Sequence, residues 1–202
     1  MKISEIFTSL QGEGKNQGKP CLFIRLSGCN LACRWCDTAY AQEGGTEVSC
    51  EAILEQCWRE NPRLVCITGG EPLLQKDALL SLLPSLHKRG TIVDIETNGT
   101  IAFTDVQPYA SVCMDVKCPS SGETSDLSLL RTIRPEDSVK FVVGNREDCE
   151  YAHRVMDSYA IAGEIFFSPV YGADYKPLVD YILRNNLPVR FQVQLHKVLG
   201  VK

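Results

Sequence analysis

The sequence lacks long apolar runs and clusters of basic residues. No segment approaches the roughly 18 apolar residues of a membrane-spanning helix, and the N-terminal residues Met1–Glu5 show neither the apolar core nor the cleavage site of a secretory signal. The 21 Lys and Arg residues are spread along a chain of net charge −4, so no segment would follow a phosphate backbone. We therefore expect a cytoplasmic protein with no membrane or nucleic-acid partner.

Histidine is scarce, with three residues, whereas cysteine is abundant, with ten. Cysteine-rich composition indicates disulfides mainly in short secreted chains, and this chain has 202 residues and no secretory signal. Five cysteines lie in apolar segments and are expected to be reduced, small hydrophobic residues: Cys21, Cys57, Cys66, Cys113 and Cys149. Three others lie close together and require a different explanation.

Short apolar segments alternate with longer amphipathic ones from residue 21 onward. The pattern predicts strands over 21–26, 64–68, 92–96, 112–116, 138–143, 164–167 and 189–194, and helices over 49–60, 76–88, 146–159 and 174–186. The strands show little polar alternation, which favours a parallel sheet covered by helices in a repeated β/α unit.

The chain length limits how many such units can form. A closed eightfold barrel typically needs about 250 residues, so we expect a single domain of 202 residues with an incomplete TIM-type (β/α)6 barrel over residues 21–202. Residues 1–20 are expected to form a covering, substrate-binding segment. The open side of the barrel would be closed by this segment, by the C-terminal tail or by a second subunit.

Glycine-rich and polar segments follow the predicted strands. They are Ser27-Gly28-Cys29, Gly69-Gly70-Glu71-Pro72, Glu96-Thr97-Asn98-Gly99, Asp115–Pro119 and Gln194–Lys197. Because α/β barrels build their active sites at the carboxyl ends of the strands, these segments are expected to form one site.

Cys29, Cys33 and Cys36 lie within eight residues, separated by three and then two residues. This spacing lets one loop direct three sulfurs toward one centre. A cubane iron–sulfur cluster normally takes four cysteines, so three would leave one iron without a protein ligand. Structural zinc is the alternative, but it needs four Cys or His ligands, and no histidine lies near this loop. We expect a [4Fe–4S] cluster.

An aromatic residue, Trp35, precedes the last of these cysteines, and Gly69-Gly70-Glu71-Pro72 follows the next predicted strand. Together they resemble the radical S-adenosylmethionine (SAM) superfamily. The resemblance implies that the open iron binds SAM and that the reduced cluster cleaves it to a 5′-deoxyadenosyl radical. Glu71 would assist the methionine ammonium group or order its loop. For the polar residues at strand ends, capping and turn roles remain the alternative. The SAM site implied by the resemblance consists of Trp35, Cys36, Asp37, Gly70, Glu71, Asn98, Asp115 and Lys117.

The segment Ile6–Gly14 contains Ser-Leu-Gln-Gly-Glu-Gly, whose amides and carboxylate suit a guanidine-like heterocycle edge. A flexible N-terminal loop is the alternative. Together with Phe23–Leu31, Cys36-Asp37-Thr38 and Gln194–Lys197, the segment resembles the 7-carboxy-7-deazaguanine synthase family, and the resemblance covers nearly the whole chain. It implies a carbon–nitrogen lyase of queuosine biosynthesis that converts 6-carboxy-5,6,7,8-tetrahydropterin to 7-carboxy-7-deazaguanine with loss of ammonia.

The same family resemblance implies ligands and partners. Mg²⁺ would bind Thr38, which could otherwise cap a helix. Arg25 would pair with the substrate carboxylate, although a structural ion pair is the alternative, and a structural role is the alternative for His196. The partners would be an electron donor such as flavodoxin or ferredoxin and a second copy of the chain in a homodimer. The implied substrate-binding residues are Leu10, Gln11, Gly12, Glu13, Arg25, Thr68 and His196.

Two other functions fit part of the pattern. A glycyl-radical-activating enzyme shares the cysteine loop and the Gly-Gly-Glu-Pro segment but needs a surface that docks a peptide. A non-catalytic iron–sulfur or zinc protein needs only the cysteines. Cleavage of SAM and turnover of the carboxypterin separate these functions from deazaguanine synthesis.

Overall fold

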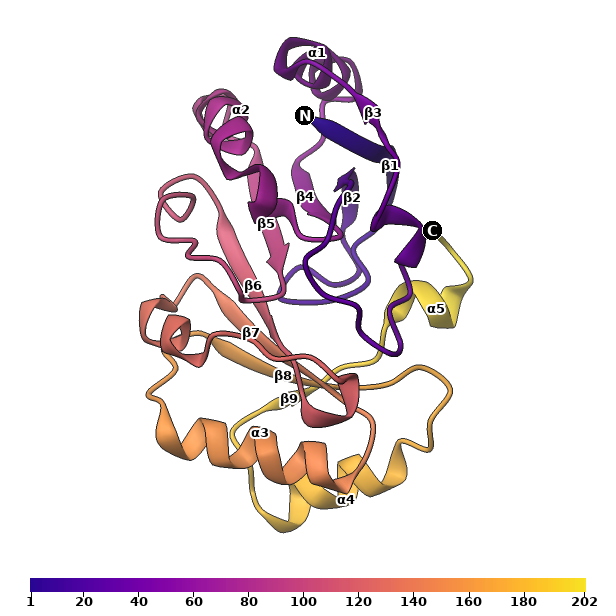
Figure 1. The fold of residues 1–202 in the computed structure, drawn as a ribbon, viewed down its shortest axis with the longest axis vertical. Helices are drawn as coiled ribbons and strands as arrows, with labels where there is room; N and C mark the ends of the chain where they lie inside the picture. The colour runs from indigo at the N-terminus through magenta and orange to yellow at the C-terminus, as the bar shows by residue number, and fades with distance from the viewer.

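Seven parallel strands form the centre of the structure, a computed structural model that describes residues 1–202. Two further strands, β1 and β3, extend one edge of this sheet: β1 pairs antiparallel with β2, and β3 pairs antiparallel with β1. The sheet runs β3-β1-β2-β4-β5-β6-β7-β8-β9 without closing into a barrel (Figure 1). The strands are β1 (Lys2–Leu10), β2 (Pro20–Leu26), β3 (Thr46–Glu47), β4 (Leu64–Gly69), β5 (Ile92–Thr97), β6 (Ser111–Val116), β7 (Ser138–Val143), β8 (Glu164–Pro169) and β9 (Arg190–Phe191). The predicted incomplete barrel is confirmed.

Four α-helices lie on the outer face of the curved sheet, α1 and α2 along one half and α3 and α4 along the other (Figure 1). They are α1 (Cys50–Glu60), α2 (Lys76–Lys88), α3 (Arg146–Ser158) and α4 (Lys176–Arg184). Ser49 caps α1 by accepting a hydrogen bond from the amide of Ala52, and α2 continues through Pro84. Shorter helical segments are η1 (Ala39–Ala41), η2 (Pro72–Gln75), η3 (Pro119–Ser121), η4 (Leu127–Thr132) and α5 (Leu195–Leu199).

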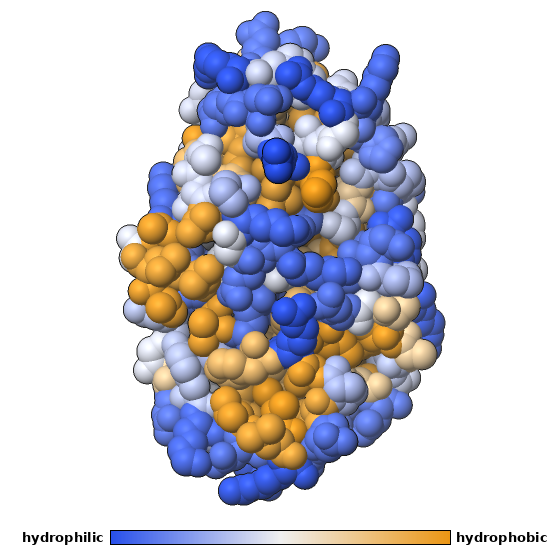
Figure 2. All heavy atoms as spheres, turned by 180° about the vertical axis from the view of Figure 1, so that it is seen from behind, coloured by the Kyte–Doolittle hydropathy of each residue, from blue (hydrophilic) through white to orange (hydrophobic).

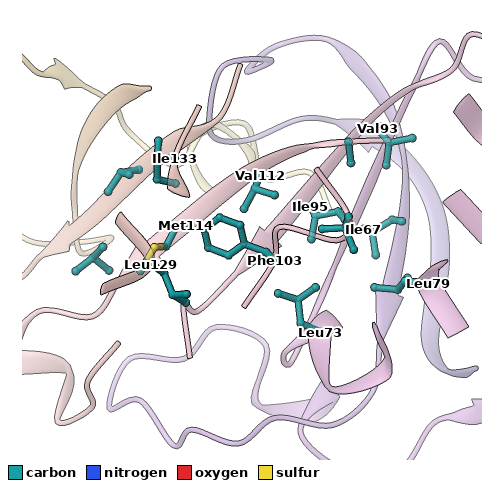
Figure 3. Close-up of a cluster of buried hydrophobic side chains, with 14 of the residues drawn as sticks. Ile67, Leu73, Leu79, Val93, Ile95, Phe103, Val112, Met114, Leu129 and Ile133 are labelled. Carbon is teal, nitrogen blue, oxygen red and sulfur yellow. The ribbon is translucent and has the colours of Figure 1, made fainter. Parts of the chain in front are cut away.

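The main hydrophobic core lies between the sheet and these outer elements. Figure 3 shows strand residues such as Ile67, Ile95 and Met114 packed with Leu73, Leu79 and Phe103 from the covering segments. A second, smaller apolar cluster of Cys21, Phe23, Leu64 and Cys66 lies apart from this core on β2 and β4.

The repeated β/α unit is interrupted in the middle of the chain. No α-helix separates β5 from β6, and only η3 and η4 separate β6 from β7. Phe103 and Val106, in the β5–β6 connection, are fully buried in the main core. Irregular segments therefore cover these strands as helices would, by burying large apolar side chains against them.

The expectation of little polar alternation is wrong. Val93 and Ile95 of β5 belong to the outer core, whereas Glu96 lines a cavity on the inner face. The same alternation places Asp115 of β6 and Lys140 of β7 in that cavity. Because successive side chains of a strand point to opposite faces, β5, β6 and β7 each place apolar side chains on the outer face and a charged side chain in the cavity.

The N-terminal segment is a strand followed by an inward-folded loop. β1 pairs with β2 from Ile3 to Leu10, and the hairpin loop over 11–19 buries Gln11 and Glu13 inside the barrel. The loop also closes the open side: the amide of Gly14 donates to Gln192 Oε1 at 2.7 Å, and the amide of Leu195 donates to the Gly12 carbonyl at 3.0 Å. The leading segment and the C-terminal segment thus close the barrel together.

The end of the chain differs from the expected strand over 189–194. Only Arg190–Phe191 form β9, and Leu195–Leu199 form the short helix α5. No helix in the structure has the length and apolar character needed to cross a membrane.

Candidate active site

A cavity of about 340 Å³ opens at the carboxyl ends of the parallel strands. Its walls include residues from every segment that the sequence pattern singled out, so these segments come together around one cavity, as expected. Of the residues expected to bind cluster, SAM, Mg²⁺ or substrate, all but Glu71 line this cavity: Leu10, Gln11, Gly12, Glu13, Arg25, Cys29, Cys33, Trp35, Cys36, Asp37, Thr38, Thr68, Gly70, Asn98, Asp115, Lys117 and His196.

The cysteine loop is held against the loop that follows β4. The amide of Glu71 donates to the Gly28 carbonyl at 2.7 Å, and the amide of Gly70 donates to the Leu26 carbonyl at 3.2 Å. A Cβ at Gly70 would lie 2.0 Å from the Gly28 oxygen and 2.8 Å from Cys29 Cβ. Glycine is therefore required at this position so that the two backbones can approach.

The donor set of this loop fits an iron–sulfur cluster better than a single metal ion. Cys29, Cys33 and Cys36 are free, partly exposed thiols that line one cavity. No three Cys, His, Asp or Glu side chains gather around one point as the ligands of a single ion would. In a cubane each cysteine binds a different iron, so the sulfurs stand farther apart. Three free thiols on one loop of the cavity, each able to bind a different iron, therefore fit a cluster.

Glu71 orders the loops and does not face the cavity. It is fully buried, and its carboxylate accepts hydrogen bonds from the Leu73 amide at 2.9 Å, the Thr97 hydroxyl at 2.9 Å and the Asn98 amide at 2.7 Å. Burial raises the pKa of Glu71, although these three donors oppose the shift. Of its two predicted roles, these hydrogen bonds support the ordering of the loop, and the contact with SAM stays a prediction.

Replacement of Glu71 by Gln should destabilise the fold. The amide NH2 must face at least one of the three donors, so one buried hydrogen bond is lost and we expect the free energy of unfolding to fall by about 1–3 kcal/mol. Urea denaturation at pH 7 measures this change. Glu55→Gln, on the exposed side of α1, is the matched control and should change it by less than about 0.5 kcal/mol. Equal stabilities for the two variants would contradict the role of Glu71.

The deep end of the cavity is formed by the hairpin loop and inward-facing strand residues. Gln11 Nε2 lies 3.4 Å from Glu96 Oε1, and the Thr68 hydroxyl lies 3.2 Å from Glu96 Oε2. Burial raises the pKa of Glu96, with the ammonium of Lys140 opposing the shift. The floor of the cavity therefore offers amide, hydroxyl and carboxyl groups side by side, as a heterocycle with adjacent donors and acceptors requires.

A row of buried charges connects this floor to the rim. Lys140 Nζ lies 2.7 Å from Glu13 Oε2 and 3.5 Å from Asp115 Oδ2, and Lys117 Nζ lies 3.0 Å from the same Asp115 oxygen. Burial opposes the charge of Lys140, but Glu13 and Asp115 outweigh it and raise the pKa of Lys140 well above its ordinary value. Burial likewise opposes ionisation of Asp115, and Lys117 and Lys140 outweigh it and lower its pKa.

Sequence reasoning missed Lys140. Its signal was a lysine at an alternate position of an otherwise apolar run, Ser138–Val143, where it must lie on the opposite face from Val139 and Phe141.

Arg25 lies on the wall of the cavity and is already in an ion pair. Its Nε lies 2.9 Å from Glu5 Oε1, and neither Nη group has a hydrogen-bond partner in the protein. Glu5 also accepts a hydrogen bond from the Tyr40 hydroxyl at 2.7 Å and pairs with Lys202. The structural ion pair considered from the sequence is therefore present, and it leaves the two Nη groups free for a ligand.

His196 packs on the hairpin loop. A Cβ at Gly12 would lie 2.0 Å from His196 Nδ1, so the ring occupies the space that glycine leaves. His196 Nε2 and Lys197 Nζ lie 3.8 and 3.2 Å from Asp37 Oδ2. Burial opposes ionisation of Asp37, but His196 and Lys197 outweigh it and lower its pKa. These contacts join α5 to the cysteine loop across the cavity mouth.

Asn98 and Thr38 lie beside the cysteines. Asn98 Nδ2 donates to Asn30 Oδ1 at 2.9 Å and lies 4.0 Å from Cys29 Sγ. Thr38 precedes η1 without a capping hydrogen bond from its side chain, and its hydroxyl lies 3.8 Å from Cys36 Sγ. The capping alternative for Thr38 is therefore not seen, and its hydroxyl is free to bind a ligand.

Known proteins are similar to this sequence along its whole length. A profile described as the radical SAM superfamily matches residues 23–111. A 7-carboxy-7-deazaguanine synthase from Methanospirillum hungatei JF-1 is 53% identical over 201 residues, which cover 100% of this chain and 86% of the relative. The chain belongs to the 7-carboxy-7-deazaguanine synthase family. A synthase of the same name from Bacteroides thetaiotaomicron is 48% identical and is covered to 98%.

The fold of a solved member of this family supports the assignment. The crystal structure of QueE from Escherichia coli superposes with a TM-score of 0.79 at 29% identity, covering 96% of this chain and 94% of that chain. As a radical SAM lyase of this family, the chain uses a [4Fe–4S] cluster, SAM and Mg²⁺ and acts on a small molecule with electrons from a reductant. Membership favours deazaguanine synthesis over the two other functions considered from the sequence.

Proposed function

We propose that this chain converts 6-carboxy-5,6,7,8-tetrahydropterin (carboxypterin) to 7-carboxy-7-deazaguanine and releases ammonia. One observation carries the proposal: the hairpin residues Gln11, Gly12 and Glu13 and the three cysteines line the same cavity. A heterocycle bound on the hairpin loop is thereby confined with the cofactors of the cysteine loop, and α5 limits the access of water.

The cysteine loop and its neighbours would hold the cofactors. Cys29, Cys33 and Cys36 are assigned to the cluster, with Asn98 beside Cys29. The backbone around Gly70 and the polar side chains of Asp115 and Lys117 are assigned to SAM, together with Trp35, Cys36 and Asp37. When bound, the cluster and SAM supply a 5′-deoxyadenosyl radical that removes a hydrogen atom from the substrate.

The chain's own residues would bind and orient the carboxypterin. Gln11 and Thr68 lie with Glu96 at the floor, where they offer donors and acceptors to the pterin edge. Glu13 Oε1 is buried without a hydrogen-bond partner and is free to accept from a ring N–H. The Nη groups of Arg25 would hold the substrate carboxylate. Leu10, Gly12 and His196 would complete the pocket by packing and backbone contacts.

Thr38 is assigned to the magnesium ion. Its hydroxyl faces the cavity without a close partner. A hydroxyl ligand, waters and a substrate carboxylate match the oxygen preference of Mg²⁺, which keeps few protein ligands.

We infer a homodimer that takes electrons from a flavodoxin or ferredoxin in the cytoplasm. Ten free cysteines suit a reducing compartment. Figure 2 shows apolar side chains gathered in patches on the face opposite to Figure 1, and the exposed apolar residues include Leu183, Val198 and Leu199. Patches of this kind favour association. Sedimentation velocity at micromolar concentration tests the dimer, and a monomeric mass would contradict it.

The function is tested by anaerobic incubation with carboxypterin, SAM, Mg²⁺ and a reductant after reconstitution of the cluster. We expect release of ammonia and a product with the mass of 7-carboxy-7-deazaguanine, neither of which forms when the pterin or SAM is omitted. Formation of 5′-deoxyadenosine without this product would indicate a different substrate. Failure to form 5′-deoxyadenosine under reducing conditions would exclude a radical SAM enzyme.

A further inference from the structure

Lys140 lies between two carboxylates that come from distant parts of the chain. It projects from β7 with only 5% of the residue exposed, and its ammonium bridges Glu13 of the hairpin loop and Asp115 of β6. Neither the superfamily motifs nor the residues assigned above to substrate and SAM include it. A buried lysine is costly unless it is fully paired, so its presence in the cavity wall requires an explanation.

Both carboxylates are held in the same way. In each, one oxygen contacts an ammonium group, and the other oxygen is buried without any hydrogen-bond partner: Oε1 of Glu13 and Oδ1 of Asp115. Leaving a buried acceptor unsatisfied destabilises a fold. Because both residues line the cavity, the free oxygens are explained if bound ligands supply the missing donors.

We propose that Lys140 is a positioning residue, which binds one oxygen of Glu13 and one of Asp115 and so leaves the second oxygen of each free to accept hydrogen bonds from bound carboxypterin and SAM. This inference rests on the proposed function. Without the ammonium, Glu13 would lose the contact that holds its carboxylate, and Glu96 or Asp115 would take up a proton, because Lys140 favours the charged form of both. A protonated carboxyl group donates a hydrogen bond where the ligand needs an acceptor.

The effect should fall on the pterin more than on SAM. The titratable and charged groups that face Lys140 are Glu13 from the hairpin loop, Glu96 from β5, and Cys113, Asp115 and Lys117 from β6. Lys117 also holds Asp115, at 3.0 Å, so Asp115 keeps an ammonium partner when Lys140 is removed. Glu13 has no second cation in contact, so it loses its only ion pair.

The first test replaces Lys140 with Met in the reconstituted enzyme. We expect KM for carboxypterin to rise about 10- to 100-fold, the effect of losing a charged hydrogen bond, with a smaller change in kcat. Cleavage of SAM without pterin should stay near the wild-type rate. The acidic limb of kcat/KM should move to higher pH, because Lys140 lowers the pKa values of Glu96 and Asp115. Lys140→Arg keeps the positive charge and should return the acidic limb of kcat/KM to the pH of the wild type.

Lys88→Met, at an exposed position of α2, is the matched control and should leave KM and the pH profile unchanged. A wild-type KM and pH profile in Lys140→Met would overturn the proposal. So would equal losses of SAM cleavage and product formation in a folded variant, since that pattern indicates a general structural role.

A second comparison decides the question even if Lys140→Met fails to fold. The double variant Glu13→Gln with Lys140→Met removes one negative and one positive charge together. Proteins often tolerate the removal of both partners of a buried ion pair. If Lys140 acts through Glu13, the double variant and Glu13→Gln alone should have kcat/KM values within about twofold of each other. A double variant about tenfold worse than Glu13→Gln would show that Lys140 acts elsewhere. Failure of the proposed function itself is distinguishable, because wild-type enzyme would then make no deazaguanine.

Discussion

Gly70→Ala should abolish retention of the iron–sulfur cluster. The new Cβ would lie 2.0 Å from the Gly28 oxygen, which belongs to the backbone and cannot rotate away. The cysteine loop must therefore move, and the hydrogen bond from the Glu71 amide to the Gly28 carbonyl is lost with it. We expect iron per chain after reconstitution to fall far below that of the wild type, and SAM cleavage to fall with it, while most of the secondary structure remains.

Gly90→Ala provides the matched control for this prediction. Gly90 has a positive φ of 77° with no atom within 4 Å of the added Cβ, so the substitution strains the backbone without a clash. It should cost about 1 kcal/mol of stability and leave the iron content unchanged. Full iron content and normal SAM cleavage in Gly70→Ala would show that the close approach of the two loops is not needed.

Arg25→Ala should separate cofactor chemistry from product formation. Removal of both free Nη groups deletes two charged hydrogen bonds to the substrate carboxylate, which together contribute at least about 3 kcal/mol, so product formation should fall by at least about 100-fold. Slow cleavage of SAM, uncoupled from the pterin, should persist because Arg25 does not contact the cysteine loop. Product and 5′-deoxyadenosine are measured in the same anaerobic reaction.

The fold should tolerate this change, because Glu5 keeps Tyr40 and Lys202 as partners. Arg25→Lys retains the charge without the planar fork and should recover only part of the activity. Arg154→Ala, at an exposed position of α3, should stay within about twofold of the wild type. Equal loss of SAM cleavage and product in Arg25→Ala would indicate that Arg25 forms the structural ion pair with Glu5 and does not bind the substrate.

The positions of the barrel strands along the chain and the position of the cavity could be predicted because both depend on local patterns. Runs such as 64–68 and 138–143 are apolar enough to define buried strands, and the carboxyl ends of parallel strands meet at one edge whatever the details of the connections. The connections themselves were less predictable. Phe103 covers the sheet from an irregular segment, and burial of one large side chain leaves no periodic signal in the sequence.

For the hairpin loop, the binding residues were predictable from the sequence, but the position of the loop in the fold was not. Its glycines and polar residues predicted an exposed, binding-competent segment, and Gln11 and Glu13 do line the cavity. That the loop enters the barrel and joins the segment after β9 on the open side follows from its contacts with Gln192 and Leu195, about 180 residues later in the chain. No local pattern encodes a contact at that distance.

The sequence by itself indicated the chemistry of this protein: the spacing of Cys29, Cys33 and Cys36 favours a cluster with an open iron, because spacing within one loop decides which ligands that loop can present. Only the tertiary structure decided which side chains line the cavity together. Lys140 meets Glu13 across 127 positions, and Glu71 turns toward Thr97 and Asn98 instead of the cavity. Such contacts depend on the register of the strands, where a shift of one residue would reverse every inward-facing side chain.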